Sequence, residues 1–208
     1  MPAIWNGFPF IFTDTLSYIT SGIAFQAPPD RPIFYGLLIS TSGMLTKIWG
    51  VVIFQSVILS YFLLRFSNIL FPRIEKKYLY LGITLMVSLT SLPWFVGQIS
   101  PDIFTSILFL VLIVFALTYK ESSKVDTFFI ATIITLSVCV HSSNLIIGFL
   151  TFIAIICWFI FKKFAWRDWR KFALVVIASF LVSVIFIIAS NIWSHYGATL
   201  NPTGKVFI

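Results

Sequence analysis

Three aspartates stand apart from the basic clusters of the chain and are its clearest candidates for chemistry. They are Asp14, Asp30 and Asp102, and each lies near a long apolar segment. A carboxylate in such surroundings is costly unless a partner neutralises it, which makes each of them a candidate site residue. Asp14 and Asp102 could act as general bases that take a proton from an attacking hydroxyl group. We therefore predict a catalytic role for these two aspartates.

Both catalytic candidates also have a purely structural interpretation. Asp14 precedes the apolar run 15–25 and could accept hydrogen bonds from the free N–H groups at the start of a helix. Asp102 follows a serine and a proline, a sequence typical of a helix start. The loop before Asp102 is short, however, so its carboxylate stays close to the ends of the apolar segments and can share a cavity with Asp14. Pro93 could kink the preceding segment and open such a cavity.

Three further residues are candidates for substrate binding. Arg31 could hold a phosphate, because a guanidinium recognises phosphate through two hydrogen bonds. Asp30 could pair with Arg31 or could simply precede a helix that starts at Pro32. His141 lies in the polar turn 141–144, which could be the edge of a sugar or phosphate site or an ordinary turn.

No motif for a metal, a nucleotide or another cofactor is present in the sequence. It has no Walker loop, no GxSxG, no HExxH and no CxxC pattern. Its two cysteines, Cys139 and Cys157, lie inside apolar segments and lack the spacing of a disulfide framework or a metal site. We therefore predict no metal and no cofactor.

The composition of the chain places these candidates in a membrane protein. Of its 208 residues, 59% are hydrophobic and only 10% are charged, with a mean hydropathy of +1.01, whereas a soluble domain is about one-quarter charged. A chain with so few polar residues cannot cover a water-soluble core. We therefore expect its apolar side chains to face the lipid bilayer. The net charge of +7 does not indicate nucleic-acid binding, because the basic residues lie in short loops between apolar segments. The sequence thus predicts an all-α, polytopic transmembrane helical bundle.

About six membrane spans are predicted. A spanning helix needs roughly 20 apolar residues, with about 17 to 25 tolerated. The apolar segments that approach this length cover residues 48–66, 78–98, 103–119, 127–140, 145–161 and 173–193. Before the first of them, the runs 15–25 and 33–45 flank a proline-rich stretch and predict two short helices at the membrane interface.

The distribution of Lys and Arg predicts the orientation of these spans. If the loops after the first, third and fifth spans are cytoplasmic, that side holds all of the 14 Lys and Arg except Arg31, Lys47 and Lys205. Such an excess of basic residues marks the cytoplasmic side, so both ends of the chain are expected on the non-cytoplasmic side. The remaining acidic residues, Glu75, Glu121, Asp126 and Asp168, are expected to form solvated charge clusters with the cytoplasmic basic residues.

Three regions follow from this topology: an outer segment at 1–45, the transmembrane bundle at 46–193 and an outer tail at 194–208. No span precedes the outer segment to carry it across the membrane, and the chain ends in the polar stretch 201–205. We therefore expect a fragment that lacks one N-terminal span and a C-terminal portion. The alternative is a short N-terminus that crosses the membrane unaided.

The motifs around the outer aspartates resemble those of the GT-C superfamily, the integral membrane glycosyltransferases that use polyprenyl-phosphate-linked sugars. The similarity consists of an aspartate in the first outer loop, two interfacial helices around the Asp-Arg-Pro motif at 30–32, and the Pro-Asp pair at 101–102 that starts a later span. It extends over roughly residues 6–145. Many members have an acidic pair in the first loop, whereas this chain has one acid there, Asp14.

The resemblance implies transfer of a sugar from a lipid-linked donor to a hydroxyl acceptor on the non-cytoplasmic face. Asp14 matches the acid that acts as catalytic base or orients the acceptor, and Asp102 matches the acid of the second loop. Arg31 matches the basic residue that binds the lipid phosphate. The style of the sequence favours a bacterial inner membrane.

Two other classes of function remain open. A transporter or flippase portion would place polar groups at the middle of the membrane, where this chain has Gln55 and hydroxyl residues but no charge. A non-catalytic membrane scaffold would tolerate replacement of Asp14, Asp30 and Asp102. No feature of the sequence specifies an oligomeric state.

Overall fold

The computed structural model describes residues 2–28, 30–46 and 48–194. Within these residues the chain is mostly helical, with ten helices and one pair of two-residue strands, so the predicted all-α class is confirmed. The N-terminal elements are α1 (Pro2–Trp5), β1 (Phe10–Ile11), α2 (Thr15–Ala24) and α3 (Phe34–Thr46). They are followed by α4 (Trp49–Leu70), α5 (Lys76–Leu89), α6 (Leu92–Val96), β2 (Gln98–Ile99), α7 (Ile103–Thr118), α8 (Lys124–Val140), α9 (Ser143–Phe161) and α10 (Trp166–Trp193).

Three of the described helices are long and apolar enough to cross a membrane. They are α4, α9 and α10. Helix α7 is apolar but has only 16 residues, which at 1.5 Å per residue gives roughly 24 Å against a hydrocarbon thickness of about 30 Å. These helices support an integral membrane protein, whereas six separate spans are not confirmed.

The segment 78–98, predicted as one span, forms two helices instead. Helix α5 ends at Leu89, and α6 begins at Leu92 with Pro93 in its first turn. A proline has no N–H to donate to the carbonyl four residues before it, which for Pro93 is the carbonyl of Leu89. The prediction of one continuous helix is therefore wrong, because Pro93 ends α5 and starts a new helix. After α6, β2 pairs with β1 in a parallel register that matches Phe10 with Gln98.

Gln55 of α4 supports this irregular segment from within the bundle. Its side chain is fully buried, and its Nε2 donates hydrogen bonds to the carbonyl oxygens of Val96 at 2.7 Å and Gln98 at 2.8 Å. Carbonyl groups that leave a helix away from water must find partners within the protein. Gln55, the polar residue on which a transport path would depend, thus has a structural role in this fold.

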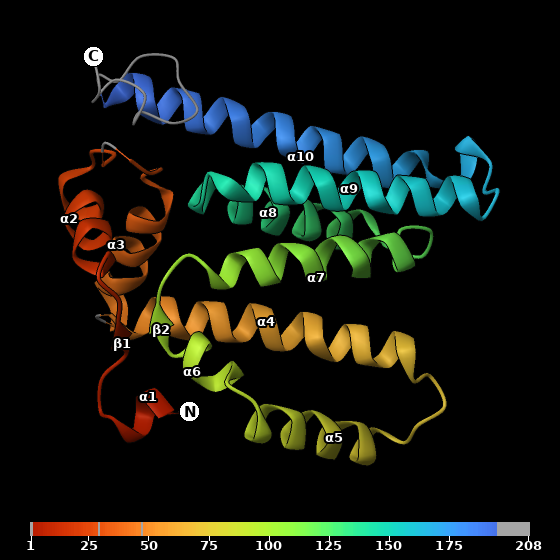
Figure 1. The fold of residues 1–208 in the computed structure, drawn as a ribbon, viewed down its shortest axis with the longest axis horizontal. Helices are drawn as coiled ribbons and strands as arrows, with labels where there is room; N and C mark the ends of the chain where they lie inside the picture. The colour runs from red at the N-terminus through yellow and green to blue at the C-terminus, as the bar shows by residue number, and fades with distance from the viewer. Residues whose placement is uncertain (1, 29, 47, 195–208) are drawn as a thin grey trace.

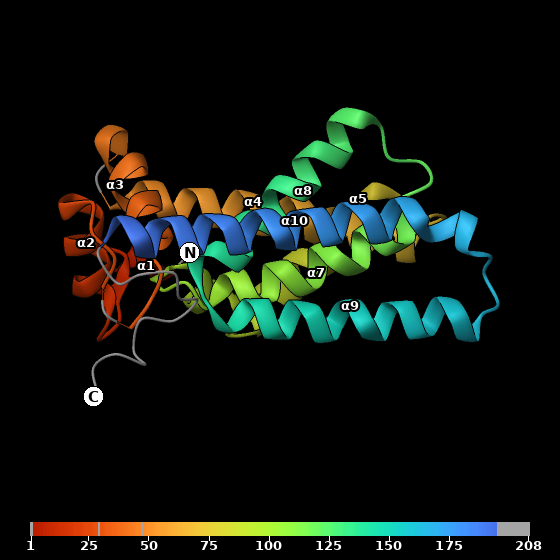
Figure 2. The ribbon, with the colours of Figure 1, turned by 90° about the horizontal axis from the view of Figure 1, so that it is seen from above.

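The long helices lie side by side in the bundle (Figure 1). Helix α7 is the most deeply packed of them, since Ile107, Leu108, Val111 and Leu112 are fully buried. It packs against α4, α8 and α9, and α8 in turn packs against α10. A view from above shows that α8 runs obliquely to its neighbours (Figure 2). By contrast, α5 lies at the edge of the bundle and buries only Leu79.

Helices α2 and α3 pack together across one end of the bundle (Figure 1). They cross at Gly22 and Gly36, where a Cβ atom on Gly36 would lie 2.5 Å from the carbonyl oxygen of Tyr18. Only glycine allows the two backbones to approach so closely, because any side chain would meet the main chain of the other helix. This crossing fixes the distance between Asp14, just before α2, and Arg31, shortly before α3.

The three loops with most of the basic residues lie together at the opposite end of the bundle. These loops connect α4 with α5, α7 with α8, and α9 with α10 (Figure 1). The structure therefore segregates the charges as the sequence predicted. Lys47, Lys205 and the predicted tail beyond residue 194 lie outside the described residues.

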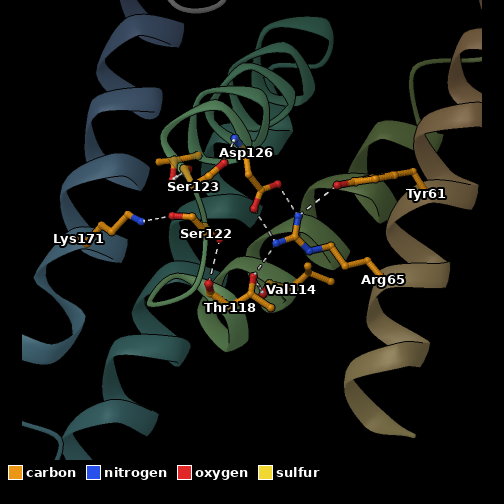
Figure 3. A network of polar contacts seen from close by, with 9 residues as sticks. Tyr61, Arg65, Val114, Thr118, Ser122, Ser123, Asp126 and Lys171 are labelled. Atoms are coloured by element: carbon orange, nitrogen blue, oxygen red, sulfur yellow. Dashed lines mark hydrogen bonds and ion pairs between the residues drawn. The ribbon is translucent and has the colours of Figure 1, made fainter. Parts of the chain in front are cut away.

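Arg65 and Asp126 form an ion pair at this basic end (Figure 3). Nη1 and Nη2 of Arg65 on α4 contact Oδ1 and Oδ2 of Asp126 on α8 at 2.5 and 2.7 Å, and each side chain is only 20% exposed. Arg65 also donates to Tyr61 Oη and to Thr118 Oγ1, both at 3.2 Å. The expected pairing of Asp126 with a basic residue is therefore found, but the pair is not solvated as predicted, because α4, α7 and α8 enclose it.

Two other acidic residues at this end do lie in solvated pairs, as expected. Glu75 contacts Lys77 at 2.7 Å, with both side chains about two-thirds exposed. Asp168 lies 3.9 Å from Lys120, and both of these side chains are also exposed. The basic end thus combines one enclosed ion pair with open surface charge.

Candidate functional site

A cavity of about 130 Å³ lies at the end of the bundle covered by α2 and α3. Four segments that are far apart in the sequence form it: the start of α2, the loop before α3, the loop before α7 and the turn between α8 and α9. All five residues predicted as site residues line it, namely Asp14, Asp30, Arg31, Asp102 and His141. The other lining residues are Phe12, Tyr18, Ser100, Pro101 and Ser142.

Asp14 stands at the N-terminus of α2 but does not cap the helix with its side chain. Thr15 organises the turn instead, since its hydroxyl accepts from the N–H of Phe12 at 2.7 Å and donates to the carbonyl of Ile99 at 3.0 Å. The Asp14 carboxylate is left to point into the site, where Oδ2 lies 2.8 Å from Nη1 of Arg31. The capping interpretation of Asp14 therefore does not describe its side chain.

Arg31 is the central cation of the cavity. Besides Asp14, it contacts Asp30, to which its Nε donates at 2.9 Å. Its guanidinium also lies over the ring of Tyr18, with 5.1 Å from Cζ to the ring centroid, a favourable cation–π arrangement. Hydrogen bonds from Arg31 hold the pKa of Asp30 below its usual range, and these carboxylates raise the pKa of Arg31. The arginine is thus charged and oriented by three neighbours.

Asp102 faces His141 across the cavity. One carboxylate oxygen of Asp102 accepts from the hydroxyl of Ser100 at 2.8 Å, and the other lies 4.0 Å from Nε2 of His141. Nδ1 of His141 is buried and has no hydrogen-bond partner among the described residues. Like Asp14, Asp102 precedes its helix without a side-chain capping bond. Neither carboxylate is therefore held by a capping bond to the helix that follows it.

Asn144 fixes the turn that holds His141, a role that sequence reasoning missed. Its side chain is fully buried, its Nδ2 donates to the carbonyl of Ser137 at 2.7 Å, and its Oδ1 accepts from Thr105 Oγ1 at 2.6 Å. These contacts join α7, α8 and α9 next to Asp102 and His141. The sequence signal was an asparagine in the first turn of an apolar helix, where a polar side chain needs partners.

The ring of Tyr18 lies under the guanidinium of Arg31 and packs against the ring of Tyr35. The two rings meet edge to face with 5.1 Å between their centroids, and burial raises the pKa of both hydroxyl groups. The hydroxyl of Tyr35 is buried without a hydrogen-bond partner among the described residues. Both tyrosines therefore stay neutral, and Tyr18 separates Arg31 from the apolar core.

The exposure of the charged groups determines what a ligand meets at this cavity. The side chains of Asp14, Asp30 and Asp102 are 43%, 40% and 66% exposed, whereas Arg31 is only 18% exposed. A ligand therefore meets proton acceptors at the opening and a positive charge behind them. Within residues 2–28, 30–46 and 48–194, no cluster of three or more His, Cys, Asp and Glu is placed to hold a metal ion. The three carboxylates suit hydroxyl groups as ligands, and Arg31, which is paired with Asp14 and Asp30, is the one Lys or Arg among the described residues that line the cavity.

Comparison with models of protein families, with curated proteins and with solved structures finds no match for this chain. The resemblance of its outer motifs to the GT-C superfamily remains an expectation. The function is therefore inferred from the chemistry of the cavity and from its place at the end of an apolar helical bundle.

Proposed function

We propose that this chain forms the outer-face site of a GT-C-like membrane glycosyltransferase, which moves a sugar from a polyprenyl-phosphate donor to a hydroxyl acceptor. One observation carries the proposal. Two candidate bases, a cation and a histidine from four distant segments line one cavity at the end of the bundle opposite the basic loops. A lipid-linked sugar presents its phosphate and sugar at that depth, just beyond the apolar helices.

Asp14 acts as the general base in this proposal. It takes the proton of the acceptor hydroxyl while the acceptor oxygen forms a bond to the anomeric carbon of the sugar. The bond between that carbon and the phosphate oxygen breaks, and its electron pair leaves with the lipid phosphate. The side chain of Asp14 is 43% exposed, so an acceptor hydroxyl can reach its carboxylate.

Arg31 supplies the positive charge that stabilises the departing phosphate. A phosphate oxygen would compete with Asp30 for the donors of the guanidinium, and Asp30 is exposed enough to give way. Such a planar fork binds phosphate through two parallel hydrogen bonds. Asp14 can retain Nη1 during this exchange, because Asp30 binds through Nε and Nη2.

Asp102 and His141 form the opposite wall and orient the acceptor or the sugar. The acid receives one hydrogen bond from Ser100 and offers its other oxygen toward the histidine. Both side chains can bind sugar hydroxyls, the carboxylate as an acceptor and the imidazole as donor or acceptor. Asp102 would also hold the acceptor hydroxyl in line with Asp14.

The proposal also includes a transmembrane topology with more crossings than the three helices α4, α9 and α10. Helices α4, α7, α8, α9 and α10 and the broken pair α5–α6 cross the bilayer, so that both ends of the chain are non-cytoplasmic. The basic loops at one end support this orientation, because such loops stay on the cytoplasmic side. A bacterial inner membrane, with its lipid-linked sugars, is the proposed location.

The test is sugar transfer by the purified chain in proteoliposomes. The donors are a panel of polyprenyl phosphates that carry radiolabelled hexoses, with bacterial cell-envelope material as acceptor. Asp14→Asn should lower the transfer rate by about 10² to 10⁴, the usual contribution of a positioned base. The matched control is Glu75→Gln, an exposed acid at the opposite end, which should transfer at the wild-type rate. Sugar transfer that persists in Asp14→Asn would show that Asp14 is not the general base.

A further inference from the structure

A surface of basic and aromatic side chains lies at the end of the bundle opposite the candidate site. It consists of the turn between α9 and α10 and the nearby loop between α7 and α8 (Figure 1). Outside the pair of Arg65 and Asp126, its acidic residues are Glu121 and Asp168. Its basic residues are Lys120, Lys124, Lys162, Lys163, Arg167, Arg170 and Lys171. This basic surface therefore carries an excess of positive charge.

Contacts between the two segments hold the basic surface together. Lys171 of α10 donates to the carbonyl of Ser122 at 2.7 Å, and a carboxylate oxygen of Asp168 lies 3.9 Å from Nζ of Lys120. The same Nζ of Lys120 lies 5.9 Å from the ring centroid of Phe164 in the turn. The two segments therefore form one continuous surface.

Four basic side chains of the turn between α9 and α10 are exposed and unpaired. Among the residues that the structure describes, none offers them a salt bridge, a ring contact or a side-chain hydrogen bond; the four are Lys162, Lys163, Arg167 and Arg170. At the same end of the bundle, Arg65 is neutralised by Asp126. The four unpaired cations thus remain available to an external anion.

Lys163 has a backbone conformation that favours glycine. Its φ is 56°, in the left-handed region, directly after the end of α9. Its N–H donates to the carbonyl of Ile160 at 2.8 Å, and the N–H of Phe164 donates to the carbonyl of Phe159 at 3.0 Å. Glycine is usual at this position of such a helix end, because a Cβ atom is strained there. The chain therefore has a cation where glycine would be less strained.

Exposed aromatic side chains flank these cations. Phe161, Phe164 and Trp166 are 82%, 42% and 56% exposed. The ring of Trp166 meets that of the buried Trp169 edge to face, with 4.3 Å between their centroids, which holds Trp166 in place. Exposed Trp and Phe beside Lys and Arg are typical of segments that lie in the headgroup region of a membrane. The aromatic residues therefore favour a lipid surface over a soluble polyanion as the partner.

The length of α10 places the basic surface at the level of the lipid headgroups. Its 28 residues extend for roughly 42 Å at 1.5 Å per residue, against a hydrocarbon thickness of about 30 Å. All of its charged residues lie in the segment 166–171, at its start. Because charges are costly in hydrocarbon, the excess length of α10 falls at this end. Since both α9 and α10 are long and apolar enough to cross a membrane, the turn between them lies at the boundary.

We infer that the basic surface binds the headgroups of anionic phospholipids such as phosphatidylglycerol. The exposed Lys and Arg side chains attract the lipid phosphates, and the guanidinium groups of Arg167 and Arg170 can each bind a phosphate through two hydrogen bonds. The exposed rings of Phe161 and Trp166 pack among the upper parts of the acyl chains. This inference concerns the end of the bundle opposite the candidate site and does not depend on the proposed function.

Native mass spectrometry of the full chain in detergent tests this inference. The protein is titrated with phosphatidylglycerol or with phosphatidylcholine of the same acyl chains, and the dissociation constant of the first bound lipid is compared. The two lipids differ in net charge, so a headgroup site for anions should bind phosphatidylglycerol at least about tenfold more tightly. Equal affinity for the two lipids would overturn the inference.

Two matched double substitutions locate the binding site. Arg167→Gln combined with Arg170→Gln should weaken phosphatidylglycerol binding by roughly fivefold for each cation removed. The control, Arg73→Gln combined with Lys76→Gln, removes the same charge from the loop between α4 and α5 and should change the affinity by less than about twofold. Equal losses in the two double variants would overturn the assignment to the basic surface.

Lys163→Gly separates a role in lipid binding from a role in folding. Glycine relieves the left-handed backbone and removes one cation. Phosphatidylglycerol should therefore bind about fivefold more weakly, whereas the melting temperature in lipid-free detergent should stay the same or rise. A lower melting temperature with unchanged lipid affinity would show that Lys163 has only a structural role and would count against the inference.

A soluble polyanion is the competing partner for a basic surface. The same titration is therefore repeated with polyglutamate and with a short RNA. Binding of either polymer by a chain that shows no preference for phosphatidylglycerol would assign the surface to a soluble partner and overturn the inference. A preference for phosphatidylglycerol that the Arg167→Gln and Arg170→Gln pair abolishes, with no polymer bound, would support it.

Discussion

Replacing Gly36 by alanine should push α3 away from α2 and disturb the candidate site. A Cβ atom at this position would lie 2.5 Å from the carbonyl oxygen of Tyr18 and 2.8 Å from the backbone nitrogen of Gly22, whereas real Cβ atoms essentially never come within 3.0 Å. Both obstacles are backbone atoms and cannot rotate away. The two helices must therefore separate by about 0.5 Å or more.

The separation of α2 and α3 should lower the free energy of unfolding and lengthen a contact in the candidate site. Overpacking of a tight contact usually costs about 1–3 kcal/mol, and for a chain of this size each kcal/mol lowers the melting temperature by about 2–4 °C. The same movement would stretch the contact between Asp14 and Arg31 from 2.8 Å toward the upper limit of a hydrogen bond, about 3.2 Å. Both the melting temperature and sugar transfer should fall.

The assay is thermal unfolding in detergent, followed by circular dichroism, together with the transfer assay in proteoliposomes. The matched control is Gly43→Ala in the same helix, where a Cβ atom would meet nothing within 4 Å. Alanine is favoured over glycine within a helix by about 1 kcal/mol, so Gly43→Ala should be neutral or slightly stabilised. A Gly36→Ala variant that melts no lower than Gly43→Ala would refute the close crossing of α2 and α3.

Two further predictions concern the ion pairs at the two ends of the bundle. Asp126→Ala leaves the partly enclosed Arg65 without its partner and should lower the free energy of unfolding by about 2 kcal/mol. Lys77→Ala removes an exposed pair and should change the free energy of unfolding by less than about 0.5 kcal/mol. Equal melting temperatures of the two variants would show that enclosure of the Arg65–Asp126 pair adds no stability. Because Arg31 lowers the pKa of Asp30, their pairing stabilises the fold above about pH 3.8 and is lost as the pH falls below it. The difference in melting temperature between wild type and Asp30→Asn should therefore shrink on acidification to about pH 2, and a constant difference would contradict the pairing.

Much of the fold follows from local sequence properties. Helices formed at the predicted segments because apolar runs between short polar loops leave the backbone no other way to satisfy its hydrogen bonds in lipid. The two short helices α2 and α3 also lie where the proline-bounded runs predicted helices. Pro93 predicts a kink in this segment, whereas the structure has a full break between α5 and α6.

The candidate site was predictable in its members but not in its contacts. The five candidate residues were recognisable because charged or polar groups beside apolar segments need partners. Their pairing was not, because Asp14 meets Arg31 only where α2 and α3 cross at two glycines. The supporting contact from Asn144 to Thr105 likewise spans 39 positions of the chain.

By itself, the sequence determined the apolar surroundings, the helical class and the gathering of most basic residues at one end of the bundle, because each depends on composition and on the order of residues along the chain. Tertiary structure alone decided which charges meet. Arg65 and Asp126 are 61 positions apart, and Thr15 bonds to a carbonyl 84 positions away. Nothing local encodes such distances, because they result from how whole helices pack. The cavity arises from that packing and from the two glycines that let α2 and α3 cross closely.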